Sequence, residues 1–194
     1  MGRKKTISDS ALLDVARHVF VNQGFGASTK EIARQAGISE GVIFQRFSSK
    51  DELFFAAMIP PAASLNDVIR KSRSRGRALM EEVTLAMLEY CRETLPVLLP
   101  LMMHPAFRFE EFAQKHPDSP MTALRRELTA FMVQQKQAGA IGDVDPGAAA
   151  LLVWGTAQTV AFFERLGAHG GRFDAEMIRR TVRCMWRGLD PAPR

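Results

Sequence analysis

The stretch that most constrains the fold comprises residues 28–50 and reads STKEIARQAGISEGVIFQRFSSK. Ser28 and Glu31 have the spacing of a capping box, which favours a helix start. Gly37 suits the left-handed residue that ends a helix, because glycine has no Cβ to clash there. Ser39 can cap a second short helix directly after the turn. The pattern predicts a helix-turn-helix.

The residues on either side of this turn predict a small helical module. From Ser8, apolar residues at helical spacing indicate an amphipathic helix that stops at Gly24. Ser49 and Glu52 repeat the capping-box spacing, so a further helix is expected to start there. We therefore predict a three-helix module over residues 8–47. Its expected core includes Leu12, Ala16, Val19, Phe20, Phe25, Ile32, Ala33, Ile43 and Phe47.

The order T-x-x-x-I-A-x-x-A-G-I-S-x-G-x-I-F-x-x-F-x-x-K, from Thr29 to Lys50, resembles the DNA-binding signature of the tetracycline-repressor-type (TetR) regulators. With the preceding helix, the resemblance covers roughly the first quarter of the chain. It implies an all-α protein with a helix-turn-helix DNA-binding domain over residues 1–50. Residues 51–194 would form a larger helical domain for effector binding and dimerisation. The usual mode of action in this family is repression.

The distribution of charge agrees with a polyanionic partner. The net charge is +5. Residues 1–50 contain eight basic and four acidic side chains, so +4 of this excess lies in the predicted DNA-binding module. An architectural DNA-bending protein would be far more basic. The basic segment over residues 1–7 is either a disordered tail or a contact to the DNA backbone or minor groove.

The second helix of a helix-turn-helix enters the major groove, and the resemblance assigns DNA contacts by position. Gln45 can pair bidentately with adenine, and Arg46 can reach guanine or phosphate. Lys30 and Lys50 suit phosphates. Glu40 either accepts from cytosine N4 or favours a helix N-terminus. The complete predicted set is Thr29, Lys30, Ser39, Glu40, Gly41, Val42, Phe44, Gln45, Arg46 and Lys50.

Three positions depart from the commonest pattern of the resembling family. Phe44 stands where tyrosine is frequent, and Val42 replaces a frequent threonine, so two hydroxyl groups are lost. Arg46 stands where histidine is frequent, which makes the position permanently cationic. We expect affinity to rest on Arg46 and Lys50.

Beyond residue 50 the chain again predicts helices only. The Pro60–Pro61 pair should break the helix that starts near Lys50, which can resume through Leu65. Pro96, Pro100 and Pro105 should leave the LPVLLPLMMHPAF run short and kinked. Further helices with one apolar side are expected around Leu79–Cys91, Leu124–Met132 and Asp174–Leu189. Asp145–Pro146 is a good helix start, and the helix from there to Leu166 is expected to be apolar on nearly every side.

The last two predicted helices are apolar enough to need more than one covering surface. A two-fold related copy would cover them as a four-helix bundle, and a dimer would read a pseudo-palindrome with half-sites ~34–36 Å apart. The alternative is a monomer with a thicker core. The predicted dimer interface consists of Trp154, Phe163, Ile178, Val182, Met185 and Leu189.

The resemblance also implies a small-molecule effector, although no motif identifies one. Aromatic and methionine side chains suit a hydrophobic or aromatic ligand, yet the same residues also make ordinary cores. Gln158 is the one amide in an apolar helix and needs a partner. Residues 70–77, RKSRSRGR, have three interpretations. They form a solvated loop or helix start, they make an extra contact to DNA, or they attract an anionic effector. The predicted lining is Met87, Tyr90, Cys91, Met102, Phe107, Phe131, Trp154, Gln158 and Phe162.

Nothing in the sequence favours an enzyme. Cys91 and Cys184 lack CxxC spacing, and no catalytic, metal or cofactor motif is present. His104 and His116 flank proline turns and are expected at the surface. The N-terminus lacks the apolar core of a signal peptide, and no uninterrupted apolar run reaches ~18 residues, so a cytoplasmic protein is expected. An effector-independent or protein-partner-gated regulator remains the alternative.

Overall fold

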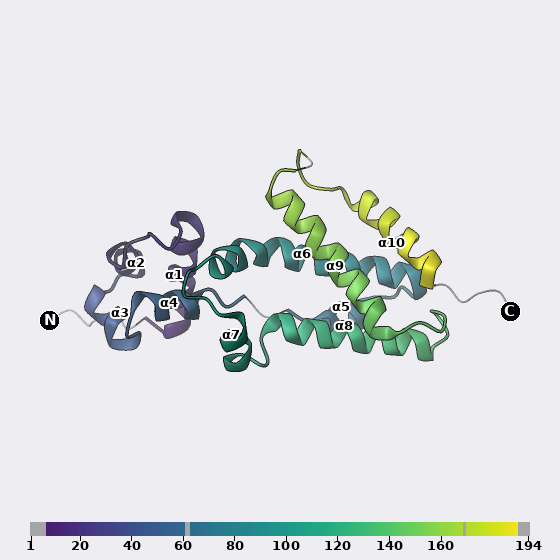
Figure 1. The fold of residues 1–194 in the computed structure, drawn as a ribbon, viewed down its shortest axis with the longest axis horizontal. Coiled ribbons are helices and arrows are strands. Elements are labelled where there is room, and N and C mark those ends of the chain that lie inside the picture. Colours follow the sequence, from purple (N-terminus) through teal and green to yellow (C-terminus); the bar gives the residue numbers. More distant parts are fainter. Residues whose placement is uncertain (1–6, 61–62, 169, 190–194) are drawn as a thin grey trace. The chain divides into compact units, whose positions relative to one another are not determined.

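The computed structural model describes residues 7–60, 63–168 and 170–189 (Figure 1). In these residues it contains ten α-helices and no strand, which confirms the all-α prediction. The chain divides into two compact units, Met1–Pro60 with Pro96–Lys115 and Pro61–Leu95 with His116–Arg194. Six of the seven positions of the predicted basic arm, and Pro61, lie outside the described residues.

The first unit is built around the helix-turn-helix. It contains α1 (Asp9–Gln23), α2 (Thr29–Ala36), α3 (Glu40–Arg46), α4 (Lys50–Ala57) and α7 (Phe109–Lys115). Helix α1 packs against α2 and α4, and α2 packs against α3. The predicted core is confirmed, because the residues expected inside are buried or packed against the buried cluster. Helix α7 was not predicted.

His104 lies in this core, so the expectation of a surface position is wrong. Only 8% of the residue is exposed. Its ring centroid is 4.3 Å from that of Phe25 and 5.1 Å and 5.0 Å from those of Phe54 and Phe55. The Nδ1 atom accepts a hydrogen bond from the Ala106 amide at 3.2 Å. Aromatic packing outweighs the usual preference of a turn histidine for water.

Helix α6 (Gly76–Met102) corrects the predicted effect of two prolines. It continues through Pro96 and Pro100, where a short and kinked segment was expected. An interior proline costs about 3 kcal/mol of helix stability. Val97 and Leu101 on the same turns are 5% and 1% exposed, so burial of this segment offsets that cost.

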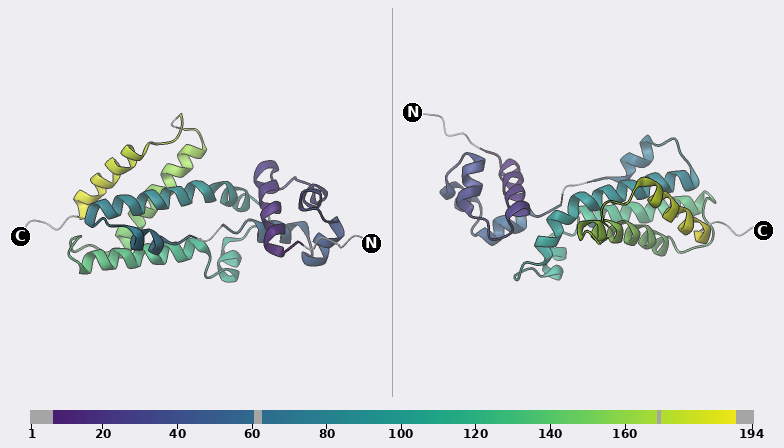
Figure 2. Two further views of the ribbon diagram at one scale, coloured as in Figure 1. Left: turned by 180° about the vertical axis from the view of Figure 1, so that it is seen from behind. Right: turned by 90° about the horizontal axis from the view of Figure 1, so that it is seen from above.

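The second unit contains α5 (Leu65–Lys71), α6 up to Leu95, α8 (Pro120–Gln137), α9 (Pro146–Arg165) and α10 (Ala175–Leu189). Helix α5 is the predicted resumption after the proline pair. Helix α9 starts where predicted, and Asp145 caps it by accepting from the Ala148 amide at 2.7 Å. Helices α8 and α9 pack together, and α5 packs on α8 (Figure 2).

The apolar stripe of α10, which was predicted to lie in a dimer interface, is buried within this unit. Ile178, Val182 and Leu189 are 2%, 0% and 6% exposed and belong to the intramolecular core. Trp154 and Met185 pack against the same core. An amphipathic pattern shows which face of a helix is buried but does not show which surface covers it. Here the core of the same chain covers the apolar face of α10.

Helix α9 instead presents an exposed apolar face. Large apolar residues there are between 39% and 67% exposed: Leu151, Leu152, Phe162 and Phe163. By length and by a mean hydropathy of 1.2 over 18 residues, α9 could cross a membrane, with 28% of that window buried. Core helices of soluble proteins pass the same test. One such helix, packed along α8, is weak evidence for a membrane span.

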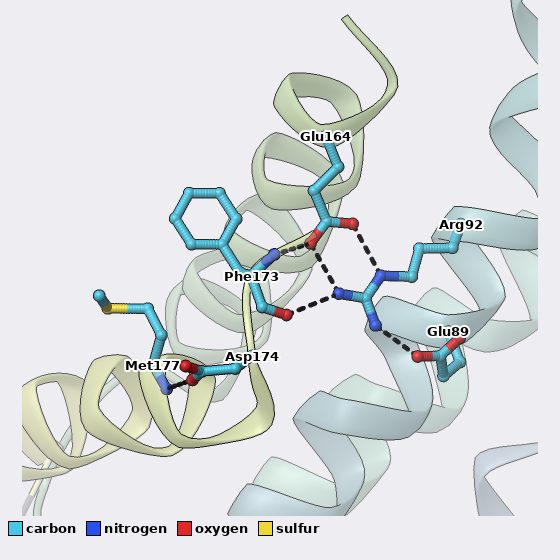
Figure 3. A network of polar contacts seen from close by, with 6 residues as sticks. All are labelled: Glu89, Arg92, Glu164, Phe173, Asp174 and Met177. Atoms are coloured by element: carbon cyan, nitrogen blue, oxygen red, sulfur yellow. Dashed lines mark hydrogen bonds and ion pairs between the residues drawn. The ribbon is translucent and has the colours of Figure 1, made fainter. Parts of the chain in front are cut away.

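A buried ion pair joins the helices of the second unit (Figure 3). The Arg92 guanidinium of α6 donates to both carboxylate oxygens of Glu164 on α9, at 2.7 and 2.6 Å. It also donates to the Phe173 carbonyl at 3.2 Å, and the Phe173 amide donates to Glu164 at 2.7 Å. The two charged side chains are 11% and 6% exposed. The pair fixes α6, α9 and the segment before α10 to one another.

The ionisation of Glu164 should make the free energy of unfolding depend on pH. Hydrogen bonds from Arg92 hold the pKa of this carboxyl below its usual value of 4.5. A lowered folded-state pKa contributes stability above pH 4.5, and this contribution is lost as pH falls through the folded pKa. We expect the stability difference between wild type and Glu164→Gln, from urea unfolding, to shrink below pH 4.5. A constant difference from pH 7 to pH 3 would contradict this.

Candidate nucleic-acid interface

The turn between α2 and α3 has the predicted geometry. Gly37 has φ 68° and ψ 30°, the left-handed conformation that a Cβ disfavours. Its amide donates to the carbonyls of Ala33 and Arg34, and the Ile38 amide donates to Ala33 at 3.0 Å. These bonds satisfy the last carbonyls of α2. The turn fixes the direction in which α3 leaves α2.

The helix caps differ in detail from the prediction. Ser28 accepts from the Lys30 amide at 3.1 Å. Glu31 does not complete a capping box, because its carboxylate accepts from Arg34 at 2.7–2.8 Å. Ser39 stands at the N-cap position of α3 but makes no side-chain cap bond. Its hydroxyl therefore remains available for another partner.

Helix α3 presents one face to solvent. Ser39, Gly41, Phe44 and Gln45 are exposed, and Val42 is half-buried. Phe44 is 46% exposed, which is unusual for a phenylalanine, whereas Ile43 beside it is fully buried. Packing of Ile43 in the core therefore fixes the inner face of α3. The Phe44 ring and the Gln45 amide are left exposed on its outer face.

Thr29 and Glu40, both predicted to touch DNA, contact each other in the structure. The Thr29 side chain is buried at 9% exposure, and its hydroxyl donates to the Glu40 carboxylate. This bond joins the start of α2 to the start of α3. It favours the second of the two interpretations of Glu40, a role at the helix N-terminus. We therefore assign this pair to positioning α3.

Arg46 is also engaged within the protein. Its Nη1 donates to the Ile7 carbonyl at 2.8 Å and to Asp9 Oδ1 at 2.9 Å. The Arg46 side chain is 23% exposed. It ties the end of α3 to the start of α1, and therefore to the point where the basic N-terminal segment joins the module.

We expect Arg46→Ala to lower both stability and DNA affinity. Loss of two partly exposed bonds should reduce the free energy of unfolding by about 1 kcal/mol, and DNA affinity should fall about tenfold. Thermal unfolding and DNA titration measure the two effects. Arg34→Ala is the stability control, since Arg34 is 71% exposed and pairs only within its own helix. Unchanged stability of Arg46→Ala would contradict the tethering role.

The two predicted phosphate-binding lysines lie in different settings. Lys30 is exposed on α2. Lys50, at the start of α4, lies over the Phe25 ring with its Nζ 4.6 Å from the centroid. A cation over an aromatic face is held in place while its charge remains accessible.

The predicted effector-lining residues divide between the two units. Met87, Tyr90, Cys91 and Phe131 are buried in the core of the second unit. Trp154 packs against that core, Gln158 is half-buried, and Phe162 is exposed on α9. Met102 and Phe107 belong to the first unit, where Met102 is 59% exposed and Phe107 packs beside Phe112. Met102 lies in the first unit because α6 continues without a break and its last turns belong to that unit.

Tyr90 stands out in the core of the second unit. Its residue is 6% exposed, and among the described residues its hydroxyl has no hydrogen-bond partner. Burial raises the pKa of Tyr90 to about 12 and that of Cys91 to about 12, so both stay neutral at pH 7. An unpaired buried hydroxyl is costly and is the kind of group that a ligand satisfies.

The fold and the exposed α3 face define a helix-turn-helix protein with a separate helical domain. Residues 12–57 match the family model described as "Bacterial regulatory proteins, tetR family". The chain is 33% identical over 72 residues to the transcriptional repressor AcnR of Corynebacterium glutamicum, covering 37% of this chain and 38% of that protein. It is 38% identical over 78 residues to the transcriptional activator FasR of Mycolicibacterium smegmatis, covering 36% of each. The chain thus matches little more than a third of these relatives' length.

Solved structures extend the likeness to the whole fold. A TetR-family regulator from Mesorhizobium loti has a TM-score of 0.69 at 18% identity, over 93% of both chains. The regulator FadR of Bacillus subtilis, solved with stearoyl-CoA, has a TM-score of 0.67 at 16% identity, over 94% of this chain and all of that one. Residues 12–57 thus match the TetR family model, as the resemblance implied, and the whole chain has the fold of the TetR-family structure from Mesorhizobium loti.

Proposed function

We propose that this protein is a sequence-specific DNA-binding transcriptional regulator. In this proposal it is a repressor that a small hydrophobic or aromatic effector releases from a pseudo-palindromic operator. The observation that carries the proposal is the outer face of α3, where Phe44 and Gln45 are exposed on a helix whose back is fixed in the core. Gln45 supplies the donor and acceptor that adenine requires. DNA binding is assigned to residues 1–50, and effector binding and dimerisation to residues 51–194.

We sort the proposed DNA contacts by their exposure and by their hydrogen bonds within the protein. Exposed side chains, and half-buried ones without a hydrogen bond to another helix, supply direct contacts, whereas the Thr29–Glu40 pair positions α3. Phe44 offers an apolar surface to sugar or thymine methyl groups, and Gly41 permits close backbone approach. The direct contacts are Lys30, Ser39, Gly41, Val42, Phe44, Gln45 and Lys50. Arg46 reaches phosphate only by extending from its tether to Ile7 and Asp9.

We place the homodimer interface on the exposed apolar face of α9. Leu151, Leu152, Phe162 and Phe163 supply the surface that a two-fold related copy would cover. Phe163 is retained from the sequence-based set. The α10 stripe is left out, because the core of the same chain already buries it.

An effector site is proposed around Tyr90. Tyr90 belongs to the same buried core as Met87, Cys91 and Phe131, and its unpartnered hydroxyl would be the polar anchor of an otherwise apolar site. The FadR structure contains stearoyl-CoA, a ligand with a long apolar chain. Stearoyl-CoA is therefore the first probe, and binding should raise the melting temperature of the protein. Tyr90→Phe should weaken that shift.

An effector-independent or protein-partner-gated regulator is the second candidate. It would show no melting shift with any apolar ligand, yet it would still select an operator. Catalysis is not part of either proposal, and both place the protein in the cytoplasm with its DNA.

The experiment that tests the proposed function is selection of binding sites from random duplex DNA. We expect a pseudo-palindrome with half-site centres ~34–36 Å apart. The same selection with Gln45→Ala should lose base preference at one position in each half-site. Recovery of no motif by the wild-type protein would contradict the proposal.

A further inference from the structure

A hollow in the second unit is lined by four arginines and one tryptophan. It has a volume of about 460 Å³, in the range of small-molecule sites. The segment before α6 and the start of α6 form one side, and α10 forms the other. The lining residues are Arg75, Arg77, Ala78, Arg183, Trp186 and Arg187.

Carboxylates neutralise only part of this charge. Arg77 pairs with Glu81 at 3.4 Å, and Arg183 pairs with Glu176 at 2.6 Å. Within the described part of the chain, no carboxylate forms an ion pair with Arg75 or Arg187. Among the described residues, the hollow therefore has two guanidinium groups in excess over its carboxylate partners, an arrangement that favours a bound anion.

Local contacts hold the arginine segment in place. The Ser74 hydroxyl donates to Glu82 at 2.6 Å, and the Ser74 amide donates to Ser72 Oγ at 3.0 Å. Arg75 Nη1 donates to the Ser74 carbonyl at 2.9 Å. These hydrogen bonds hold residues 72–75 in place on one side of the hollow.

Trp186 forms a fixed aromatic wall. It packs against the core of the unit, and a Cβ added to Gly76 would lie 3.8 Å from its ring. Gly76 has φ 53°, a backbone conformation that favours glycine, and a side chain there would make only ordinary van der Waals contact with the indole. The hollow combines guanidinium groups, whose planar fork matches phosphate oxygens, with an aromatic surface on which a flat ring can stack.

We propose that this hollow binds a nucleotide with at least two phosphate groups. The phosphates lie on Arg75 and Arg187, with Arg77 and Arg183 able to leave their carboxylate partners and join them. The nucleobase lies on Trp186. This site is additional to the effector site at Tyr90, and its binding requires neither DNA nor an apolar ligand.

Isothermal titration of the full-length protein with adenosine diphosphate tests the proposal. We expect one site per chain, with pyrophosphate binding at least tenfold more weakly and adenosine showing no measurable binding. Arg75→Gln and Arg187→Gln should each weaken binding of adenosine diphosphate about tenfold. Arg180→Gln is the matched control, because Arg180 is exposed on the same α10 helix but does not line the hollow.

Several results would overturn the proposal. Absence of binding by adenosine diphosphate contradicts the site itself. An equal loss of affinity in Arg180→Gln would mean that the basic surface attracts anions without a defined site. Equal binding of pyrophosphate would remove the role of Trp186, and equal binding of adenosine would remove the role of the arginines. These outcomes are read without DNA, so they are independent of whether the chain proves to be a regulator.

Discussion

Arg92→Met is expected to lower the free energy of unfolding by about 3–5 kcal/mol, because it leaves the Glu164 carboxylate buried without its cationic partner. For a protein of this size, that loss corresponds to a fall in melting temperature of about 6–20 °C. The pair is 11% and 6% exposed, so water cannot replace the lost bonds. Thermal and urea unfolding of the purified variant measure the effect.

Two companion variants show whether the loss comes from the unpaired charge. Arg92→Met combined with Glu164→Gln removes both charges while an amide oxygen still accepts from Phe173, so it should recover part of the stability. Arg126→Met breaks an ion pair to Asp118 that is 60% and 79% exposed and should cost less than about 1 kcal/mol. Equal losses in Arg92→Met and Arg126→Met would contradict a special role for the buried pair.

Gln45→Glu should reduce operator affinity by about 100-fold or more. The change removes the amide donor for adenine and places a negative charge against the phosphates. A bidentate base contact is worth about 1–3 kcal/mol, and a dimer loses two of them. Since Gln45 is exposed on α3, the melting temperature should stay the same. Fluorescence titration of the selected operator measures the affinity.

Gln134→Glu is the matched control for this experiment. Gln134 is exposed on α8 in the second unit, so the same change in charge is made outside the proposed DNA-binding residues 1–50. We expect operator binding within about twofold of wild type, since a surface charge that does not face the DNA directly is largely screened. Equal losses in both variants would show that net charge, and not the α3 face, determines binding.

Features that depend on neighbours along the chain were predictable from the sequence. The Gly37 turn, the Asp145 cap and the buried stripe of α1 follow from spacings of three and four residues, and the structure has all of them. The helix-turn-helix is a local motif of this kind. It could therefore be recognised, together with the exposed face of its second helix.

Features that depend on distant packing were not predictable. The Arg92–Glu164 pair joins residues 72 positions apart, and the Arg46 bonds join residues 37 and 39 apart, with no local spacing to reveal them. Burial of Val97 and Leu101 overrides the helix-breaking tendency of the neighbouring prolines. The α10 stripe was correctly expected to be buried, but its periodicity could not distinguish a core partner from a second subunit.

The most direct test of the central claim compares two duplexes of equal length and composition, the selected operator and a scrambled version of it. Titration at ~0.15 M salt should show at least about 10³-fold tighter binding to the operator, with two chains bound per duplex. The ratio matters more than either affinity, because phosphate contacts alone give salt-sensitive binding to any duplex. Equal affinity for both duplexes would contradict sequence-specific regulation and leave the α3 face without its proposed role.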